Sequence, residues 1–561
     1  MKILPVNNSI NNNVSFSAKN INPKKFLAVA VSTVLAADSV VLSDNNEDKK
    51  LDSLLKDFTQ KVKTARKNNA VAFWELNVNT SPQKEKEYEI RQKEYFELYR
   101  NEELYKQLLE IDSTKLSAKY SLILKDLIKD FQKELCSGED IQNMRKNENA
   151  VLSKFNSYVH TIDGNPTSLA EILRILETEK DSVLRKKAYN AMIKRGDFLA
   201  EDIRKLVIER NNFAKNKGYS NYYDYLLQYE YNLNPEELDK LMDDIYNKTG
   251  SLRDKFNNEM HSDLKEIFGV DKLENHHYKW FSKIVPSGEL NAFIQKNIDV
   301  VDLSKKIFKQ MGYDIDELEK SGRLTLDLYP RDNKNSHGMC SQIEAGQDVR
   351  ILTNTNNTIR GLTVLMHELG HAIYYLGISP ELNYFNQNCA SEAFDESIAY
   401  IAENIIRNEN ALDGIIPKEE IKKFKDSNKK QALNFIMRMC KFTEFERDMY
   451  KNPEQDLALL WQEKSKKYGE IDSIPDNYWA TTVHYIMAPV YCQNYIRAKL
   501  MEAQVYNHLR SVLGELYRND ETSEYLRKNI FSFGSELGEK ELIKQLTGKE
   551  LSADDFIKNY T

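Results

Sequence analysis

The sequence is poor in cysteine, glycine and proline, and each shortage excludes a class of protein. Its 561 residues include five cysteines, 20 glycines and 12 prolines. The cysteines are odd in number, scattered and without a CxxC pair, which argues against a disulfide framework and against a cysteine-bound zinc site. The scarcity of glycine and proline, with abundant Lys, Glu and Leu, predicts a mainly α-helical protein.

The sequence also lacks a surplus of positive charge and a long apolar run. Its net charge is −7 at pH 7, with 41% hydrophobic and 29% charged residues. A nucleic-acid binder would usually show a basic patch, so we expect no nucleic-acid partner. The apolar run from Phe26 to Ala37 is too short to cross a bilayer as a stable helix, so we expect no stable membrane span.

The first 45 residues differ from the rest of the chain. They are rich in Asn and Ser, and we interpret them as a disordered leader. Lysines precede the apolar run, and Val34-Leu35-Ala36 suits the cleavage site of a secretory signal. This segment favours export, whereas the unpaired cysteines fit a reducing, cytoplasmic compartment.

The remaining length is enough for a large core and for two or more lobes. From Asn46 onward apolar residues recur at helical spacing, and we expect an N-terminal helical region over 46–195 followed by a second region over 196–561. Two short segments, 324–329 and 348–353, alternate like β-strands and predict a small sheet within the second region. An exposed strand edge could bind an extended peptide through backbone hydrogen bonds.

The strongest chemical signal is the run His367-Glu368-Leu369-Gly370-His371. Two histidines four residues apart lie on the same face of a helix and can hold one zinc ion at about 2.0–2.1 Å. Glu368 points into the same space and can take a proton from a water molecule that the ion activates. Thr358, or one of the asparagines before it, can cap this helix, and Gly377 is a natural place for it to end.

Zinc usually needs a third protein ligand, and a second helix-compatible run from Ala390 to Glu403 offers three glutamates. Glu392 and Glu396 share a helix face, and Glu403 lies two turns beyond Glu396. One glutamate can bind the metal while another orients a ligand histidine. The spacing alone does not choose between them.

A third segment contains His484 followed by Tyr491 and Tyr495. Their side chains could donate hydrogen bonds to a developing oxyanion.

Together these segments resemble the thimet oligopeptidase and oligoendopeptidase F family of zinc peptidases, with angiotensin-converting enzyme as a more distant relative. The similarity extends from about residue 200 to the C-terminus. The resembling segments are 327–334 with His337 and Cys340, the zinc helix at 367–371, Phe394-Asp395-Glu396 with Glu403-Asn404, the tyrosine segment after His484, and 526–556.

The resemblance implies a mainly α, two-lobed peptidase with a deep central channel and a small β-sheet next to the zinc helix. It implies one Zn²⁺ ion, held by His367, His371 and Glu396, and so selects Glu396 over Glu392 as the third ligand. Glu368 would be the general base.

The resemblance also implies roles around the ion. His484, with either Tyr491 or Tyr495, would stabilise the oxyanion, because the segment lacks the Gly-Gly usual in the family and does not fix which tyrosine acts. His337 and Gly338 would align the substrate backbone.

We therefore expect a monomeric zinc metallopeptidase that cleaves short or unfolded peptides in the manner of an oligoendopeptidase. One alternative is a peptidyl-dipeptidase or carboxypeptidase resembling angiotensin-converting enzyme. Thr482 stands where that enzyme type would need a lysine to bind a substrate C-terminus, which weakens this alternative. The residues also leave open a zinc aminopeptidase and an inactive peptide-binding protein.

Overall fold

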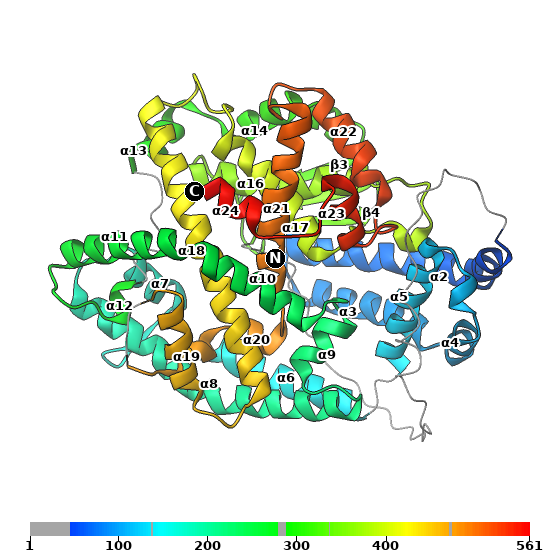
Figure 1. The fold of residues 1–561 in the computed structure, drawn as a ribbon, viewed down its shortest axis with the longest axis horizontal. Helices are drawn as coiled ribbons and strands as arrows, with labels where there is room; N and C mark the ends of the chain where they lie inside the picture. Colours follow the sequence, from blue (N-terminus) through cyan, green and yellow to red (C-terminus); the bar gives the residue numbers. More distant parts are fainter. Residues whose placement is uncertain (1–44, 136–138, 279–287, 336, 471–473, 561) are drawn as a thin grey trace.

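The computed structural model describes residues 45–135, 139–278, 288–335, 337–470 and 474–560. The predicted leader over 1–45, including its apolar run, lies outside the described residues except for residue 45. The predicted mainly α fold is confirmed, because helices make up most of the described chain and the strands form only two small sheets (Figure 1).

The helices before the larger sheet fall in the expected helical stretch. They are α2 (Asn46–Val78), α3 (Pro82–Glu97), η1 (Leu98–Arg100), α4 (Glu102–Leu109), η2 (Ser113–Lys115), α5 (Ala118–Leu135), α6 (Glu139–Ser157), α7 (Leu169–Thr178), α8 (Ser182–Asn216), α9 (Tyr222–Tyr229), α10 (Pro235–Lys248), α11 (Gly250–Phe268), α12 (Asn275–Tyr278), α13 (Gly288–Asn297), α14 (Val300–Lys309) and α15 (Ile315–Lys320). The helix α8 runs without a break across the predicted region boundary at residue 196.

The helices after the larger sheet include the two that the zinc motif predicts. They are α16 (Ile359–Gly377), η4 (Tyr384–Asn386), α17 (Glu392–Asn408), α18 (Lys418–Lys451), α19 (Leu457–Lys467), η5 (Asn477–Thr481), α20 (His484–Met487), α21 (Cys492–Leu513), α22 (Glu521–Asn529), η6 (Phe531–Phe533), α23 (Glu539–Thr547) and α24 (Asp554–Tyr560).

The two sheets are small. The first is a hairpin of β1 (His160–Ile162) and β2 (Asn165–Thr167). The second has the order β3-β5-β4, with β3 (Leu324–Asp327) parallel and β4 (Met339–Glu344) antiparallel to the central β5 (Asp348–Leu352). The strands predicted at 324–329 and 348–353 are therefore confirmed, and the segment between them adds a third strand. The helix α16 packs against β4 and β5, as expected for a sheet beside the zinc helix.

The apolar interior is divided into two large cores. The first core contains residues 290–424 and 501–546, including α14, α16, α17 and α22. The second core draws on residues from 144–155, 199–273 and 433–503 and on Ala553 and Phe556, including parts of α8, α9, α10 and α19. This division agrees with the expected two lobes, which occupy the upper and lower parts of Figure 1.

Two long helices belong to both cores. The start of α18 contributes Ile421 and Phe424 to the first core, and its later turns contribute to the second. The helix α21 contributes Leu500 to the second core and Val505 to the first. A third, smaller core joins α2, α4 and α5 at the side of the molecule (Figure 1).

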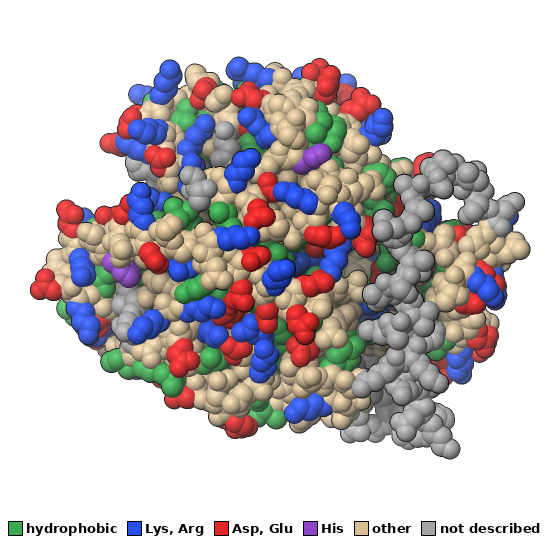
Figure 2. Space-filling view, viewed as in Figure 1, with side chains coloured by type: hydrophobic (Ala, Val, Ile, Leu, Met, Phe, Trp, Pro, Cys, Tyr) green, Lys and Arg blue, Asp and Glu red, His purple; other side chains and the backbone are tan. Residues whose placement is uncertain are grey.

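Two further features concern the surface and the cysteines. None of the helices in the described ranges is long and apolar enough to span a membrane. Basic and acidic side chains are interspersed over the face seen in Figure 2. Cys440 and Cys492 are buried as free thiols.

Candidate metal centre

The helix α16 begins and ends where the sequence predicts. Thr358 is its N-cap, with its hydroxyl accepting a hydrogen bond from the Gly361 N–H at 3.0 Å, and Gly377 is its last residue. The residues of the zinc motif lie in its third and fourth turns. Glu368 and His371 are buried and His367 is half-buried, so the motif faces the interior.

The helix α17 crosses α16 at very short range. Ser391 caps α17 by accepting a hydrogen bond from the Phe394 N–H at 3.0 Å. A Cβ atom added to Gly370 would lie 2.8 Å from the Cα of Ala399 and 2.9 Å from the Cβ of Ala402. Only glycine therefore allows this approach, which brings the acidic first turns of α17 up to the two histidines.

Three side chains converge where the helices cross. The Nε2 atoms of His367 and His371 are 3.2 Å apart, and His367 Nε2 lies 3.5 Å from Glu396 Oε2. One ligand atom from each of these residues lies within 4.8 Å of the others. Ligands of a tetrahedral zinc ion at 2.0–2.1 Å are roughly 3.3–3.4 Å apart, so the separations of 3.2 and 3.5 Å are close to those that one such ion requires.

A carboxylate contacts the Nδ1 atom of each histidine, on the side of the ring away from Nε2. His367 Nδ1 lies 2.7 Å from Glu403 Oε1, and His371 Nδ1 lies 2.7 Å from Asp395 Oδ1. The Tyr375 hydroxyl donates to the other Asp395 oxygen at 2.6 Å. A carboxylate on Nδ1 keeps the proton there and leaves the Nε2 lone pair free for a metal ion.

The three glutamates of α17 therefore make different contacts. Glu396 lies beside the two histidines, and Glu403 contacts Nδ1 of His367. Glu392 instead accepts a hydrogen bond from Asn494 Nδ2 at 3.3 Å. Asp395, which sequence reasoning did not assign, is the partner of His371. Its position directly before Glu396 suggests that it lies near the site. That it contacts His371, however, follows only from the way α16 and α17 cross.

Burial and neighbouring charges shift the pKa values of two glutamates in the site. Burial alone would raise the pKa of Glu403, but the Arg407 guanidinium and His367 outweigh it and lower the pKa to about 2. Glu403 therefore remains ionised as a partner for His367. Burial raises the pKa of Glu368, although the two histidines oppose the shift.

Gly338 lies directly against Glu368. A Cβ atom at Gly338 would come within 2.9 Å of Glu368 Oε1 and 3.2 Å of the Val364 side chain. His337, the residue before it, is exposed. The turn leading into β4 therefore brings Gly338 beside the glutamate of the motif, with His337 facing outward.

His484, Tyr491 and Tyr495 form an aromatic cluster near Glu396. The two tyrosine ring centres lie 5.3 Å apart, and each lies 6.3 Å from the His484 ring. Burial raises the pKa of both tyrosines. Glu392 and Glu396 raise that of Tyr491 further, and Glu396 does the same for Tyr495, which indicates that both rings lie near this carboxylate. His484 Nε2 is buried and has no hydrogen-bond partner among the described residues.

The backbone before Tyr491 is strained. Val490 has a φ of +62°, a left-handed conformation that β-branched residues rarely adopt and that costs about 1–3 kcal/mol. The buried Glu446 of α18 holds this residue by accepting from the Val490 N–H at 2.9 Å. Arg210 of α8, which is also buried, donates to the carbonyl of Tyr485 at 2.7 Å.

A pocket of about 320 Å³ adjoins the cluster of candidate ligands. Tyr400 and Glu403 of α17, Lys499 of α21 and several residues of α18 between Asn428 and Arg438 line it. The Tyr400 ring centre is 5.5 Å from that of His367, so the pocket lies next to the histidine pair. The pocket therefore lies between α17, which carries Glu396, and α18, which belongs to both cores.

The helical fold and this cluster define a class of protein, a metallopeptidase. Residues 175–561 match the profile of Peptidase family M3, and the chain therefore belongs to this family, which includes thimet oligopeptidase and the oligoendopeptidases. A search of curated proteins found no match. The expected resemblance to the thimet oligopeptidase and oligoendopeptidase family is thus confirmed over more than half of the chain.

Proposed function

We propose that this protein is a zinc oligopeptidase that cleaves peptide bonds in short or unfolded peptides. The observation that carries the proposal is the convergence of His367, His371 and Glu396, with ligand atoms within 4.8 Å of one another and Glu368 on the same helix. Two imidazoles and a carboxylate form a donor set typical of catalytic zinc. A zinc ion bound there would act as a Lewis acid, polarising the scissile carbonyl and acidifying the attacking water.

Glu368 is the proposed general base. Its carboxylate takes a proton from the attacking water as the oxygen bonds to the carbonyl carbon, and then gives this proton to the leaving amine as the C–N bond breaks. The raised pKa of Glu368 favours this role, because a carboxylate that binds a proton more tightly is a better proton acceptor. Gly338, pressed against Glu368, limits the positions that its carboxylate can take.

The cluster of His484, Tyr491 and Tyr495 is the proposed source of hydrogen bonds to the oxyanion. The raised pKa of both tyrosines keeps their hydroxyls protonated and able to donate at neutral pH. The unpartnered Nε2 of His484 is a second available group. Donors aimed at the developing charge stabilise it without having to reorganise during the reaction.

We further propose that the substrate binds as an extended chain. Gly338 directly precedes β4, an outer strand of the three-stranded sheet, and a peptide could pair with a strand edge through backbone hydrogen bonds alone. His337 and Gly338 would align the peptide backbone there. A channel between the two cores would admit flexible peptides and exclude folded proteins.

The decisive experiment replaces the base and leaves the ligands intact. Glu368→Gln should bind zinc as the wild type does but hydrolyse a quenched fluorescent peptide roughly 10²–10⁴-fold more slowly. Glu381→Gln, on the exposed segment after α16, is the control and should leave the rate unchanged. Undiminished hydrolysis by zinc-loaded Glu368→Gln would rule out the mechanism.

Digestion of a peptide library, with cut sites mapped by mass spectrometry, tests the oligoendopeptidase assignment. Cuts within the peptides, at varied distances from both ends, are expected. Release of dipeptides from the C-terminus alone would instead favour a peptidyl-dipeptidase.

A further inference from the structure

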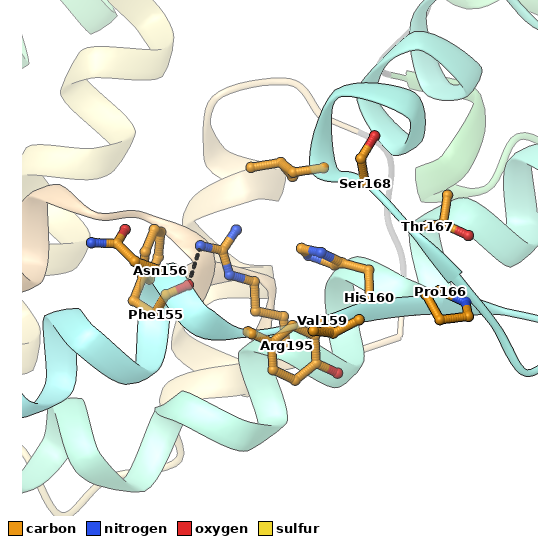
Figure 3. A pocket seen from close by; sticks show the side chains of 10 residues that line it. Phe155, Asn156, Val159, His160, Pro166, Thr167, Ser168 and Arg195 are labelled. Atoms are coloured by element: carbon orange, nitrogen blue, oxygen red, sulfur yellow. Dashed lines mark hydrogen bonds between the residues drawn. The ribbon is translucent and has the colours of Figure 1, made fainter. Parts of the chain in front are cut away.

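A second pocket lies far along the chain from the metal motif, where the β1–β2 hairpin meets α7 and α8. Its volume is about 330 Å³, and it lies between the end of α6, the hairpin and the first residues of α7 (Figure 3). Two basic side chains, His160 and Arg195, line it. Nothing in the proposed peptidase reaction uses either residue.

Arg195 is a buried cation without an anionic partner. Its side chain is only 4% exposed, and its guanidinium donates to the Phe155 carbonyl at 2.8 Å and lies 3.6 Å from the centre of the Phe155 ring. Its Nε atom has no hydrogen-bond partner, and within the described ranges no carboxylate lies close enough to form an ion pair with it. The nearby Asp197 is exposed and accepts from Asn477 Nδ2 at 2.9 Å.

His160 adds a second unsatisfied group to the same pocket. It is 3% exposed, and its Nε2 atom is buried without a partner in the part of the chain that the structure describes. Burial lowers the pKa of His160 and the neighbouring Arg195 lowers it further, so the ring is neutral at pH 7 and can carry one N–H. Figure 3 shows the His160 ring and the Arg195 guanidinium turned toward the same space.

The third wall is the start of α7. Thr167, Ser168 and Leu169 line the pocket, and the Ser168 hydroxyl accepts from the Glu171 N–H at 3.1 Å. The other N–H groups of a first helical turn have no acceptor within the helix, and the helix dipole places partial positive charge at this end. The pocket therefore combines a full positive charge, a buried ring nitrogen and a helix N-terminus.

We propose that this pocket binds a small oxyanion, a phosphate or a carboxylate, between Arg195, His160 Nε2 and the start of α7. A buried guanidinium is costly unless it is paired, and a planar oxyanion edge or a phosphate offers it two acceptors. Oxyanions also bind readily at helix N-termini. The apolar side chains of Val159, Pro166 and Leu169 at the margin would accommodate a small carbon skeleton attached to the anion.

The test is titration of the zinc-loaded full-length chain, with inorganic phosphate in one arm and acetate in the other, by calorimetry and thermal shift. One saturable site per chain is expected for at least one of the two anions, with an increase in Tm on binding. Arg195→Gln should weaken binding about 10- to 100-fold, because a hydrogen bond between charged groups is lost. His160→Leu should weaken it about 5- to 10-fold.

Arg174→Gln is the matched control, because Arg174 lies on α7 itself, is exposed and pairs with Glu171. It should bind as the wild type does. Phosphate binding without acetate binding would identify a phosphate group, and the reverse a carboxylate. Should Arg195→Gln fail to fold by circular dichroism, His160→Leu decides. Equal affinity in wild type and the pocket variants, an equal loss in Arg174→Gln, or no binding of either anion would overturn the proposal.

Discussion

Replacing Gly370 with alanine should weaken metal binding while leaving all three candidate ligands in the chain. The new Cβ atom would lie 2.8 Å from the Cα of Ala399, about 0.6 Å short of the 3.4 Å at which ordinary contact begins. The Ala399 Cα belongs to the helix backbone and cannot rotate away, so α16 and α17 must move apart. Overpacking of this kind costs about 1–3 kcal/mol.

The same movement separates the two histidines on α16 from Glu396 on α17. Zinc–ligand distances tolerate only about ±0.2 Å, so a displacement of roughly half an ångström removes or lengthens the Glu396 contact. We expect zinc affinity to fall by at least about tenfold, measured by competition with a chromophoric chelator. The free energy of unfolding of the metal-free protein should fall by the overpacking cost, which leaves the fold intact.

Gly250→Ala is the control, because a Cβ atom at this helical glycine of α11 would meet nothing closer than 3.9 Å. It should change neither zinc affinity nor, by more than about 1 kcal/mol, stability. If Gly370→Ala bound zinc as tightly as the wild type, the distance between these two helices would not determine the metal geometry, and the reasoning would be wrong.

Three further predictions concern the surroundings of the site. Glu403→Ala should reduce zinc affinity about 10- to 100-fold in a chelator competition, because His367 loses the partner of its Nδ1. Gly338→Ala should lower kcat roughly 10- to 100-fold in a peptide cleavage assay without changing zinc affinity, because the new methyl group displaces the Glu368 carboxylate. Glu446→Gln should become more stable relative to the wild type as the pH rises from 4.5 to 8, by on the order of a few kcal/mol in guanidinium unfolding.

The sign of the last prediction follows from burial, which raises the pKa of Glu446 to about 8, although the Val490 N–H and Arg210 oppose the shift. Between pH 4.5 and 8 the folded wild type holds a proton that the unfolded chain has released, so its stability falls over this range. Glutamine does not titrate. A stability difference independent of pH would show that Glu446 is ionised throughout.

The sequence was sufficient for those features that depend on local spacing. The pair His367 and His371, a helix cap at Thr358 or one of the two asparagines before it, and the helix end at Gly377 follow from helical period and capping chemistry. Choosing Glu396 over Glu392 needed the family resemblance, because both share a helix face. The strand β4 escaped prediction because Met339–Glu344 shows no clear alternation of apolar and polar residues.

Features that depend on contacts between distant segments could not be predicted. Gly370 appears in the sequence as one more helical glycine, and only the crossing with α17 shows that its missing side chain is required. Asp395 becomes the partner of His371 through the same crossing. Glu446 and Val490 are 44 residues apart, and neither residue type signals that a buried acid will hold a left-handed valine.

Because the interior is divided between two cores, metal binding and catalytic turnover depend on different parts of the protein. The candidate ligands belong to helices of the first core, whereas Tyr485, Ile486 and Val490, which surround the tyrosine segment, pack into the second. A small rotation of one half against the other, taken up by bending in α18 and α21, would shift the tyrosines without moving the three candidate ligands relative to one another. Metal content and turnover would then report on different halves of the molecule, and a fully metallated preparation could still be inactive.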